Sequence, residues 1–322
     1  MPSQPAPSGF ASGASAPPRV EAFAFGEILW DYLPSGRHAG GAPFNVCSHL
    51  VGLGIPAGIL SAVGRDELGD ELLRVADQKG VDTRFITRAR PGLATGTVRA
   101  ELDENQNASY DIVEPAAWDE IRLSPKSRKA VRGSRALIYG SLASRSRQNR
   151  EELLSLLALT GPLKLCDVNL RPPFADPELA LDLAQYANVL KLNETELVEL
   201  VAWIRGGGEV ANARGDDQAL SGACATLAEA SGVPKICITR GARGAALWEP
   251  GQLVVVKAPS THVRDTVGAG DAFMACLVHG ILHAVDPRRI LQNACSMGAF
   301  VTSKFGATPP LPDELLALVR AV

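Results

Sequence analysis

An aspartate that follows two closely spaced glycines could act as a general base beside a bound phosphate. The residues are Gly268-Ala269-Gly270-Asp271, and they precede an apolar segment of helical length, Ala272 to Leu282. The first amides of a helix lack intrahelical acceptors, and the helix dipole adds partial positive charge, so this segment predicts an anion site. Asp271 could accept the proton of a hydroxyl that attacks phosphorus. Helix capping by the same carboxylate is the alternative, because glycine-rich turns are common.

A second group of residues, near the start of the chain, could bind a compound with several hydroxyl groups. Asp31 follows a strand predicted over Val20 to Ile28, and Gly40-Gly41 precedes Asn45 in a predicted helix, Phe44 to Leu53. A carboxylate can accept hydrogen bonds from two neighbouring hydroxyls, and paired glycines let a ligand approach the backbone. A turn aspartate and a helix-start asparagine would explain the same spacing, so both interpretations stay open.

The elements that would position these residues alternate between strand and helix. Buried-type strands are predicted at 136–139, 163–169 and 235–239, with helices between them. This alternation predicts a mainly parallel sheet covered by helices on both faces. The carboxyl ends of parallel strands meet at one edge, so Asp167, Asn169 and Arg171 are expected to face a common site. Taken alone, Arg171 is more typical of a surface arginine.

One hairpin interrupts the alternation of strands and helices. The runs 97–102 and 109–113 alternate in strand fashion on either side of a polar turn. We expect this hairpin to leave the main sheet and to form a small sheet with strands around 28–38. Arg99 or Tyr110 could reach a substrate from it, although solvated strand faces explain both residues equally well.

Composition narrows the class of protein. The chain has 322 residues, 46% of them apolar, which suits one large α/β domain with an appendage or two small domains. A net charge of −3 predicts no broad basic surface for nucleic acid, and no apolar run approaches the roughly 18 residues of a membrane span.

The six cysteines are scattered along the chain, so we expect them to be buried free thiols of a protein in a reducing cytoplasm. They are Cys47, Cys166, Cys224, Cys237, Cys276 and Cys295. We expect residues 1–18 to form a disordered tail.

The glycine motifs resemble those of a known enzyme family. Segment 265–273, DTVGAGDAF, closely resembles the C-terminal signature of the ribokinase-like (PfkB) carbohydrate kinases. Segments 26–31, GEILWD, and 40–45, GGAPFN, resemble the family's sugar-binding N-terminus, particularly its fructokinase-like branch. Shorter matches follow in the family's order: D-x-N-x-R at 167–171, N-x-x-E at 193–196, T-x-G-x-x-G at 239–244 and a terminal K-x-G-A at 304–307. Phe44 departs from a position that is usually small.

The resemblance implies roles for individual residues. It makes Asp271 the catalytic base, the amides of Gly268, Ala269 and Gly270 an anion hole, and Arg171 a group that neutralises phosphate. It assigns the substrate to Asp31, Gly40, Gly41 and Asn45, and it places Asn169 near the phosphates. To the substrate-binding residues we add Asn169, Arg99 and Asp271. It assigns ATP to Asn193, Thr239, Gly241, Gly244, Gly268 and Gly270. Glu196 would act on Mg²⁺ through water, and Asp265 with the carbonyl of Val267 would bind K⁺.

The resemblance also implies the fold and the reaction. We expect a ribokinase-like three-layer α/β/α sandwich over 19–322, with lid segments at about 28–42 and 94–115. The expected activity is ATP-dependent phosphorylation of a sugar hydroxyl, with D-fructose to fructose 6-phosphate as the leading reaction. Ribose, 2-keto-3-deoxygluconate or a nucleoside are alternative substrates, and a catalytically silent sugar-binding regulatory protein is the alternative from another class. A homodimer through the lid is left open.

Overall fold

A computed structural model of the chain describes residues 19–33, 36–102, 108–207 and 216–321. The predicted tail at 1–18 and the polar turn of the predicted hairpin lie outside these residues. No described helix is both long enough and apolar enough to cross a membrane.

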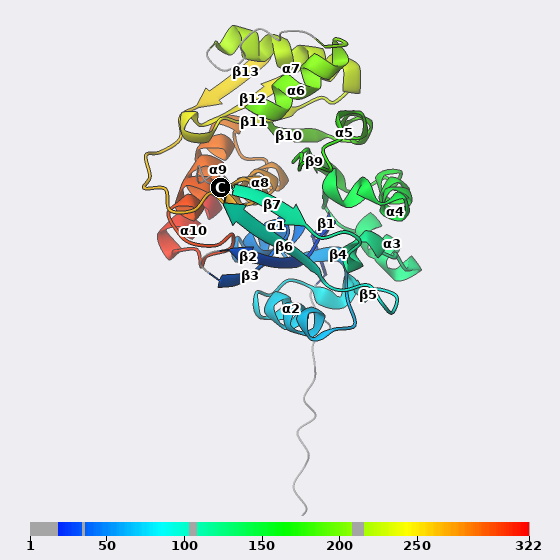
Figure 1. Cartoon of the computed structure of the whole chain (residues 1–322). Helices are drawn as coiled ribbons and strands as arrows, with labels where there is room; N and C mark the ends of the chain where they lie inside the picture. Colours follow the sequence, from blue (N-terminus) through cyan, green and yellow to red (C-terminus); the bar gives the residue numbers. More distant parts are fainter. Residues whose placement is uncertain (1–18, 34–35, 103–107, 208–215, 322) are drawn as a thin grey trace, which may run out of the picture.

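A large, mostly parallel sheet forms the centre of the molecule (Figure 1). Its strands lie in the order β13-β12-β11-β10-β9-β8-β1-β4-β5. They are β1 Ala22–Phe25, β4 Ala57–Val63, β5 Ile86–Arg88, β8 Ala136–Gly140, β9 Leu163–Asp167, β10 Val189–Asn193, β11 Ile236–Thr239, β12 Ala245–Glu249 and β13 Gln252–Val256. Only β12 runs antiparallel to its neighbours, β11 and β13. The carboxyl ends of β1, β9, β10 and β11 therefore reach the same edge of the sheet.

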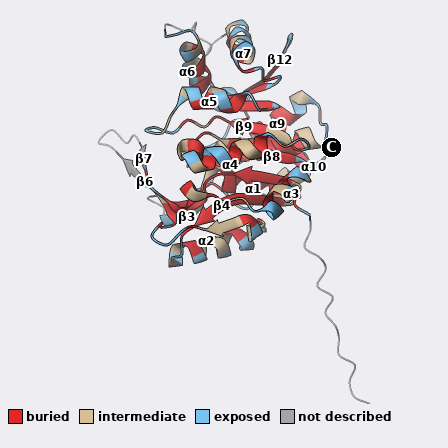
Figure 2. Cartoon of the chain, turned by 90° about the vertical axis from the view of Figure 1, so that its right-hand side faces the viewer, coloured by how far each residue is buried: buried red, intermediate tan, exposed pale blue. Residues whose placement is uncertain are grey.

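Helices cover both faces of this sheet, and Figure 2 shows buried residues concentrated between the layers. One face carries α3 Pro125–Arg132, α4 Arg147–Leu157, α5 Pro177–Ala184, α6 Glu194–Ile204 and α7 Asp217–Ser231. The other carries α1 Ala42–Gly52, α2 Glu67–Gln78, α8 Ala269–Leu282, α9 Pro287–Thr302 and α10 Asp313–Arg320. Short 3₁₀ helices occur at Thr83–Phe85, Ala117–Glu120, Leu142–Arg145 and Gly241–Arg243.

Strand β1 shows why the sheet has to be covered on both faces. Phe23 and Phe25 pack into the core beneath α3 to α7, whereas Ala22 and Ala24 pack into the core beneath α1 and α8. Successive side chains of a strand point to opposite faces, so an apolar run with both sets buried needs helices on each side. The predicted three-layer α/β/α fold is confirmed.

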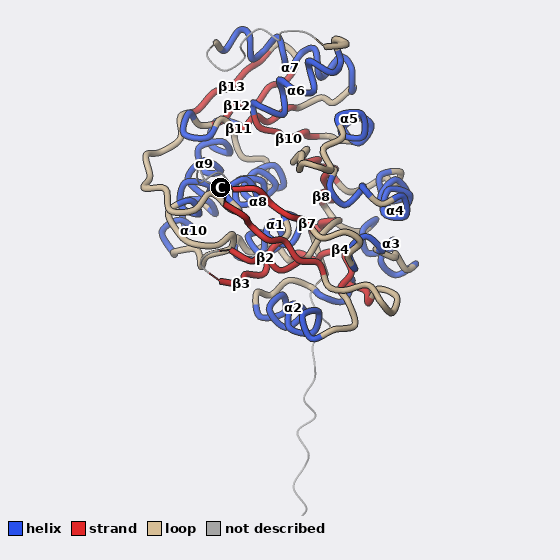
Figure 3. Tube along the Cα trace, in the orientation of Figure 1, coloured by secondary structure: helices blue, strands red, loops and turns tan. Residues whose placement is uncertain are grey.

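A second, smaller sheet projects over the amino ends of α1 and α8 (Figure 3). Its strands are β2 Leu29–Leu33, β3 Gly36–Gly40, β6 Gly96–Leu102 and β7 Ala108–Ile112, in the order β3-β2-β6-β7. Strand β2 pairs in parallel with β6, and the other two pairings are antiparallel. The predicted first strand is too long, because the main-sheet strand ends at Phe25 and the chain then enters this lid sheet. The limits of the kinase domain stay a prediction.

Candidate active site

Two cavities meet at the N-terminus of α8. The first, which we call the lid-side cavity, has a volume of about 320 Å³ and lies between the lid sheet, α1 and the carboxyl ends of the central strands. The second, the sheet-end cavity, has a volume of about 610 Å³ and lies between β11, the segment after β13, α8 and α9. Thr266 and Gly270 line both cavities, so the start of α8 is their junction.

Asp271 lies in the first turn of α8 and lines the lid-side cavity. The side-chain amide of Asn45, on α1, donates a hydrogen bond of 2.8 Å to its Oδ2. Burial raises the pKa of Asp271 to about 6, against the lowering effect of that hydrogen bond. Within the described ranges the carboxylate forms no salt bridge. It is therefore an oriented carboxylate beside an open cavity.

Asn45 supplies a further group that a ligand could use. Its Oδ1 atom is buried and accepts no hydrogen bond from any described residue. A buried acceptor without a donor is costly, so a ligand hydroxyl that donates to it would be stabilised. The neighbouring Phe44 is fully buried in the core, so the departure from the usual small residue does not narrow the cavity.

The lid-side cavity is acidic. Burial, with a contribution from the charge of Asp271, raises the pKa of both Glu27 and Asp31 to about 7. Glu27 accepts a hydrogen bond from the backbone amide of Ala42, at the start of α1. Arg171 lines the same cavity, and its positive charge acts to lower the pKa of both carboxyl groups. Such a cluster suits a ligand that donates several hydrogen bonds and carries no negative charge.

The glycine pair before α1 permits this arrangement. A Cβ atom on Gly40 would overlap the carboxylate of Asp31, and one on Gly41 would overlap the carbonyl of Glu27. Gly41 also has a φ of 101°, which L side chains rarely adopt. Gly40 therefore makes room for Asp31, while Gly41 itself lines the cavity.

Apolar residues of the lid form the opposite wall. Val98 of β6 and Ile112 of β7 line the cavity with Leu29 and Leu142. Arg99 is exposed and lines neither cavity, because alternate residues of β6 point to opposite sides and Val98 takes the inner position. The side chain of Tyr110 lies outside the described residues.

Lys191 is a site residue that sequence reasoning missed. It lies in β10, buried, and its Nζ donates to both carboxylate oxygens of Asp167, at 2.9 and 2.7 Å. A Cβ atom on Gly270 would lie 3.3 Å from Nζ, which places the ammonium beside the glycines of the α8 turn. Burial alone would lower the pKa of Lys191, but Asp167 and other nearby carboxylates raise it overall. A lysine inside an apolar strand was the signal available in the sequence.

The loop after β9 brings two predicted residues to the lid-side cavity, which Asn169 and Arg171 both line. Asn169 has a φ of 45°, an uncommon left-handed conformation for a residue other than glycine. Leu170 donates its amide to Oε1 of Glu196, and Asn193 donates its amide to Oε2. Both oxygens of Glu196 are therefore engaged in fixing this loop and the start of α6.

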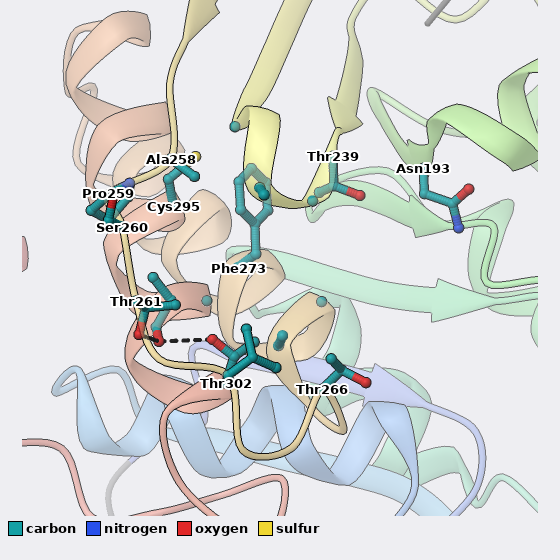
Figure 4. A pocket seen from close by; sticks show the side chains of 18 residues that line it. Asn193, Thr239, Ala258, Pro259, Ser260, Thr261, Thr266, Phe273, Cys295 and Thr302 are labelled. Carbon is teal, nitrogen blue, oxygen red and sulfur yellow. Dashed lines mark hydrogen bonds between the residues drawn. The ribbon is translucent and has the colours of Figure 1, made fainter. Parts of the chain in front are cut away.

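The sheet-end cavity contains the predicted nucleotide residues except Gly268, which lines the lid-side cavity. Asn193, Thr239, Gly241 and Gly244 line it, together with Ala269 and Gly270 of the α8 turn. Figure 4 shows Asn193 and Thr239 on one side, Cys295, Thr261 and Thr302 on the other, and Phe273 between them. Cys295 lines the cavity, whereas Asn293, two residues earlier in α9, is buried and does not.

Asp265 organises the turn that precedes α8. Its Oδ1 accepts the amide of Val267 and its Oδ2 accepts the amide of Gly306, both at 3.0 Å. The carboxylate thus joins this turn to the loop after α9. Each oxygen keeps a second lone pair, so the arrangement fits a cation ligand as well as a structural role.

Comparison with known proteins identifies the family. The family model described as pfkB family carbohydrate kinase matches residues 35–314. This match covers most of the chain, so the protein belongs to the PfkB family of carbohydrate kinases. The predicted resemblance and the predicted class of enzyme are confirmed.

Individual relatives agree with this assignment. The uncharacterized sugar kinase PH1459 of Pyrococcus horikoshii is 29% identical over 290 residues, which cover 88% of this chain and 87% of the relative. Its structure in complex with ATP has a TM-score of 0.76 at 26% identity and covers 93% of this chain and 99% of that one. The fructokinase of Escherichia coli is 28% identical over 313 residues, covering 91% and 96% of the two chains. The structure of aminoimidazole riboside kinase from Salmonella enterica has a TM-score of 0.73 at 25% identity, covering 93% and 99%.

Proposed function

We propose that this carbohydrate kinase transfers the terminal phosphoryl group of ATP to a hydroxyl of a neutral sugar, with the 6-hydroxyl of D-fructose as the leading acceptor. The observation that carries the proposal is the position of Asp271, at the junction of a polar cavity of sugar size and a larger cavity beside the sheet edge. A base at such a junction can reach a hydroxyl on one side while the helix amides meet phosphate on the other.

Each step uses groups at this junction. Asp271, oriented by Asn45, takes the proton of the attacking hydroxyl. The amides of Gly268, Ala269 and Gly270 at the α8 N-terminus stabilise charge on the transferred group. Lys191, held by Asp167, and Arg171 add positive charge close to that position.

Sugar recognition rests on acceptors rather than donors. Asp31, Glu27 and the unpaired Oδ1 of Asn45 can each accept a hydrogen bond from a sugar hydroxyl. The excess of carboxylates disfavours 2-keto-3-deoxygluconate, whose own carboxylate would be repelled. Among neutral sugars, fructose is favoured over ribose by the fructokinases among the relatives. Nucleosides are the alternative substrates, because the aminoimidazole riboside kinase has a similar structure.

The residues fit the expected cofactors in different ways. Asn193, Thr239, Gly241 and Gly244 surround the space proposed for ATP. Mg²⁺ would supply charge neutralisation between the phosphates, which would be its main ligands, and Glu196 would contact it through water. Glu196 is hydrogen-bonded to Asn193, which lines that space. Asp265 and the carbonyl of Val267 would hold K⁺.

We propose that the protein works in the cytoplasm. The cysteines are all buried and unpaired, which supports a reducing cytoplasm.

A panel of fructose, ribose, 2-keto-3-deoxygluconate and nucleosides, with coupled detection of ADP and with or without K⁺, tests the proposal. We expect the highest kcat/KM with fructose and turnover that depends on Mg²⁺. Strong turnover of ribose with negligible turnover of fructose would overturn the choice of sugar. Sugar binding without any ATP turnover would favour the silent regulatory protein.

A further inference from the structure

Three consecutive residues after α9 are each held by a side chain from a different part of the chain. Gly306 donates its amide to Asp265, at 3.0 Å. The carbonyl of Ala307 accepts a hydrogen bond from Nε2 of His49, also at 3.0 Å. The carbonyl of Thr308 accepts one from Nζ of Lys79, at 3.0 Å. The segment 306–308 is therefore fixed more firmly than an ordinary loop.

This segment lies directly behind the glycine turn of α8. A Cβ atom on Gly268 would lie 2.5 Å from Cα of Ala307, so the two backbones are in contact. Gly268 has a φ of 78°, and its carbonyl accepts the amide of Ala272 at the start of the helix. A displacement of Ala307 would therefore move the turn that carries the proposed anion hole.

Helix α1 holds both parts of the site. Asn45 and His49 are four residues apart and lie on the same face of the helix, which packs against α8 (Figure 1). Asn45 donates to the base, Asp271, while His49 holds Ala307 behind the anion hole. The helix that contributes to the sugar cavity is thus tied to the phosphate-binding turn at two points.

We propose that His49 is a positioning residue that keeps the anion hole aligned with Asp271 and couples sugar binding on α1 to nucleotide binding at α8. The proposal rests on the proposed kinase function of the two cavities. His49 touches neither cavity and takes no part in proton transfer.

The state of the imidazole suits this role. His49 is 2% exposed, and burial lowers its pKa to about 4, so the ring is neutral at ordinary pH. The bond to a carbonyl requires Nε2 to carry the proton, which leaves Nδ1 as the unprotonated nitrogen. A neutral ring with one fixed donor is a constant constraint, and it does not titrate in the working range of the enzyme.

The test compares His49→Ala with His49→Gln, which keeps an N–H donor. Calorimetry measures the Kd of a non-hydrolysable ATP analogue with and without the sugar that proves active. We expect sugar to tighten this affinity about 5-fold or more in the native protein and to have almost no effect in His49→Ala. Turnover of His49→Ala is expected to fall about 10- to 100-fold, because small misplacement of reacting groups is costly. His49→Gln is expected to recover most of both properties.

Chemical rescue separates the hydrogen bond from simple packing. A cavity of about 220 Å³ borders His49, Lys79 and Thr308, so a small ring can reach the space that His49→Ala leaves. Imidazole at pH 8 is expected to restore turnover, whereas 1-methylimidazole, which has no N–H donor when neutral, is expected not to. Equal rescue by the two compounds would overturn the proposal.

His279→Ala is the matched control, because His279 is another buried histidine that lines neither cavity. It is expected to lower the thermal midpoint but to retain the sugar–nucleotide coupling.

Two outcomes separate this proposal from the proposed function. Unchanged coupling and turnover in folded His49→Ala would overturn the role of His49 and leave the kinase function standing. A native protein that is inactive on every sugar would overturn the proposed function. If His49→Ala does not fold, His49→Met replaces it, and equal activity of the Met and Gln variants contradicts the proposal.

Discussion

Asp271 combines two properties that a catalytic base needs: an oriented oxygen and a pKa close to neutrality. Asn45 fixes the carboxylate, and burial brings its pKa to about 6. A general base acts in its deprotonated form, so kcat/KM is expected to rise as the pH increases through about 6 and to level off above 7. A pH–rate profile with saturating Mg²⁺ measures this. A profile that is flat between pH 5 and 8 would contradict the assignment.

Replacement of the same residue tests its role directly. Asp271→Asn keeps the size of the side chain but removes the proposed base, so kcat is expected to fall by about 10²- to 10⁴-fold. Thermal unfolding should show a folded protein. Near-normal turnover in this variant would show that another group accepts the proton.

Lys191 offers a second test at the scale of single residues. Removing it alone leaves Asp167 as a buried unpaired charge, which is expected to cost about 3 to 5 kcal/mol. The double variant Lys191→Met with Asp167→Leu is expected to recover most of that stability. Its turnover is expected to remain at least about 100-fold below normal, because the charge beside the proposed anion hole is still missing. Chemical denaturation and steady-state kinetics measure the two effects separately, and recovery of both would make the pair purely structural.

At the scale of the element, the start of α8 depends on two glycines with different tasks. Gly268 has a positive φ and touches the backbone of Ala307, whereas a Cβ on Gly270 would meet only Nζ of Lys191. Gly268→Ala is therefore expected to destabilise the protein by about 1 to 3 kcal/mol and to abolish most turnover. Gly270→Ala is expected to fold normally and to lower kcat alone. Comparison of unfolding curves and kcat for the two variants measures this, and equal stability loss would contradict it.

At the scale of the whole molecule, clustered carboxyl groups link stability to pH. The pKa of Glu27 and Asp31 is about 7 and that of Asp271 about 6 in the folded state, above their ordinary values near 4. Between about pH 4 and 7 the folded protein therefore binds more protons than the unfolded chain. Its stability is expected to decrease as the pH rises through this window.

Glu27→Gln isolates part of this effect, because glutamine can still accept the amide of Ala42. The variant is expected to be more stable than the native protein by on the order of 1 to 3 kcal/mol at pH 8, and equally stable near pH 4, where Glu27 is protonated. Denaturation at the two pH values measures the difference. Glu151→Gln, at an exposed position of α4, is the control and should change little. A Glu27 variant that is less stable at pH 8 would contradict the linkage.

A homodimer through the lid stays a prediction, which light scattering of the purified protein can test. The strands β3 and β7 at the edges of the lid sheet are where a second chain would pair.

Much of the fold followed from local signals in the sequence. Glycine pairs, apolar runs and helix-start residues located β8, β9, β11, α1 and α8 to within a few residues. Short helices such as α3 and α5 were not proposed, because eight residues give a weak periodic signal. The length of the first strand was overestimated, because Gly26, which has a φ of 147°, follows the end of β1 and the chain enters the lid sheet at Leu29.

By itself, the sequence determined the family, the order of the longer strands and helices, and several residues that face the edge of the sheet, because these depend on short motifs and on periodicity. Only the tertiary structure decided which of them meet. Asn45 and Asp271 are 226 positions apart, and Lys191 joins the site through a buried ion pair with Asp167. Arg99 points outward because Val98 occupies the inner face of the lid. Such contacts depend on how distant elements pack, and no local pattern records that packing.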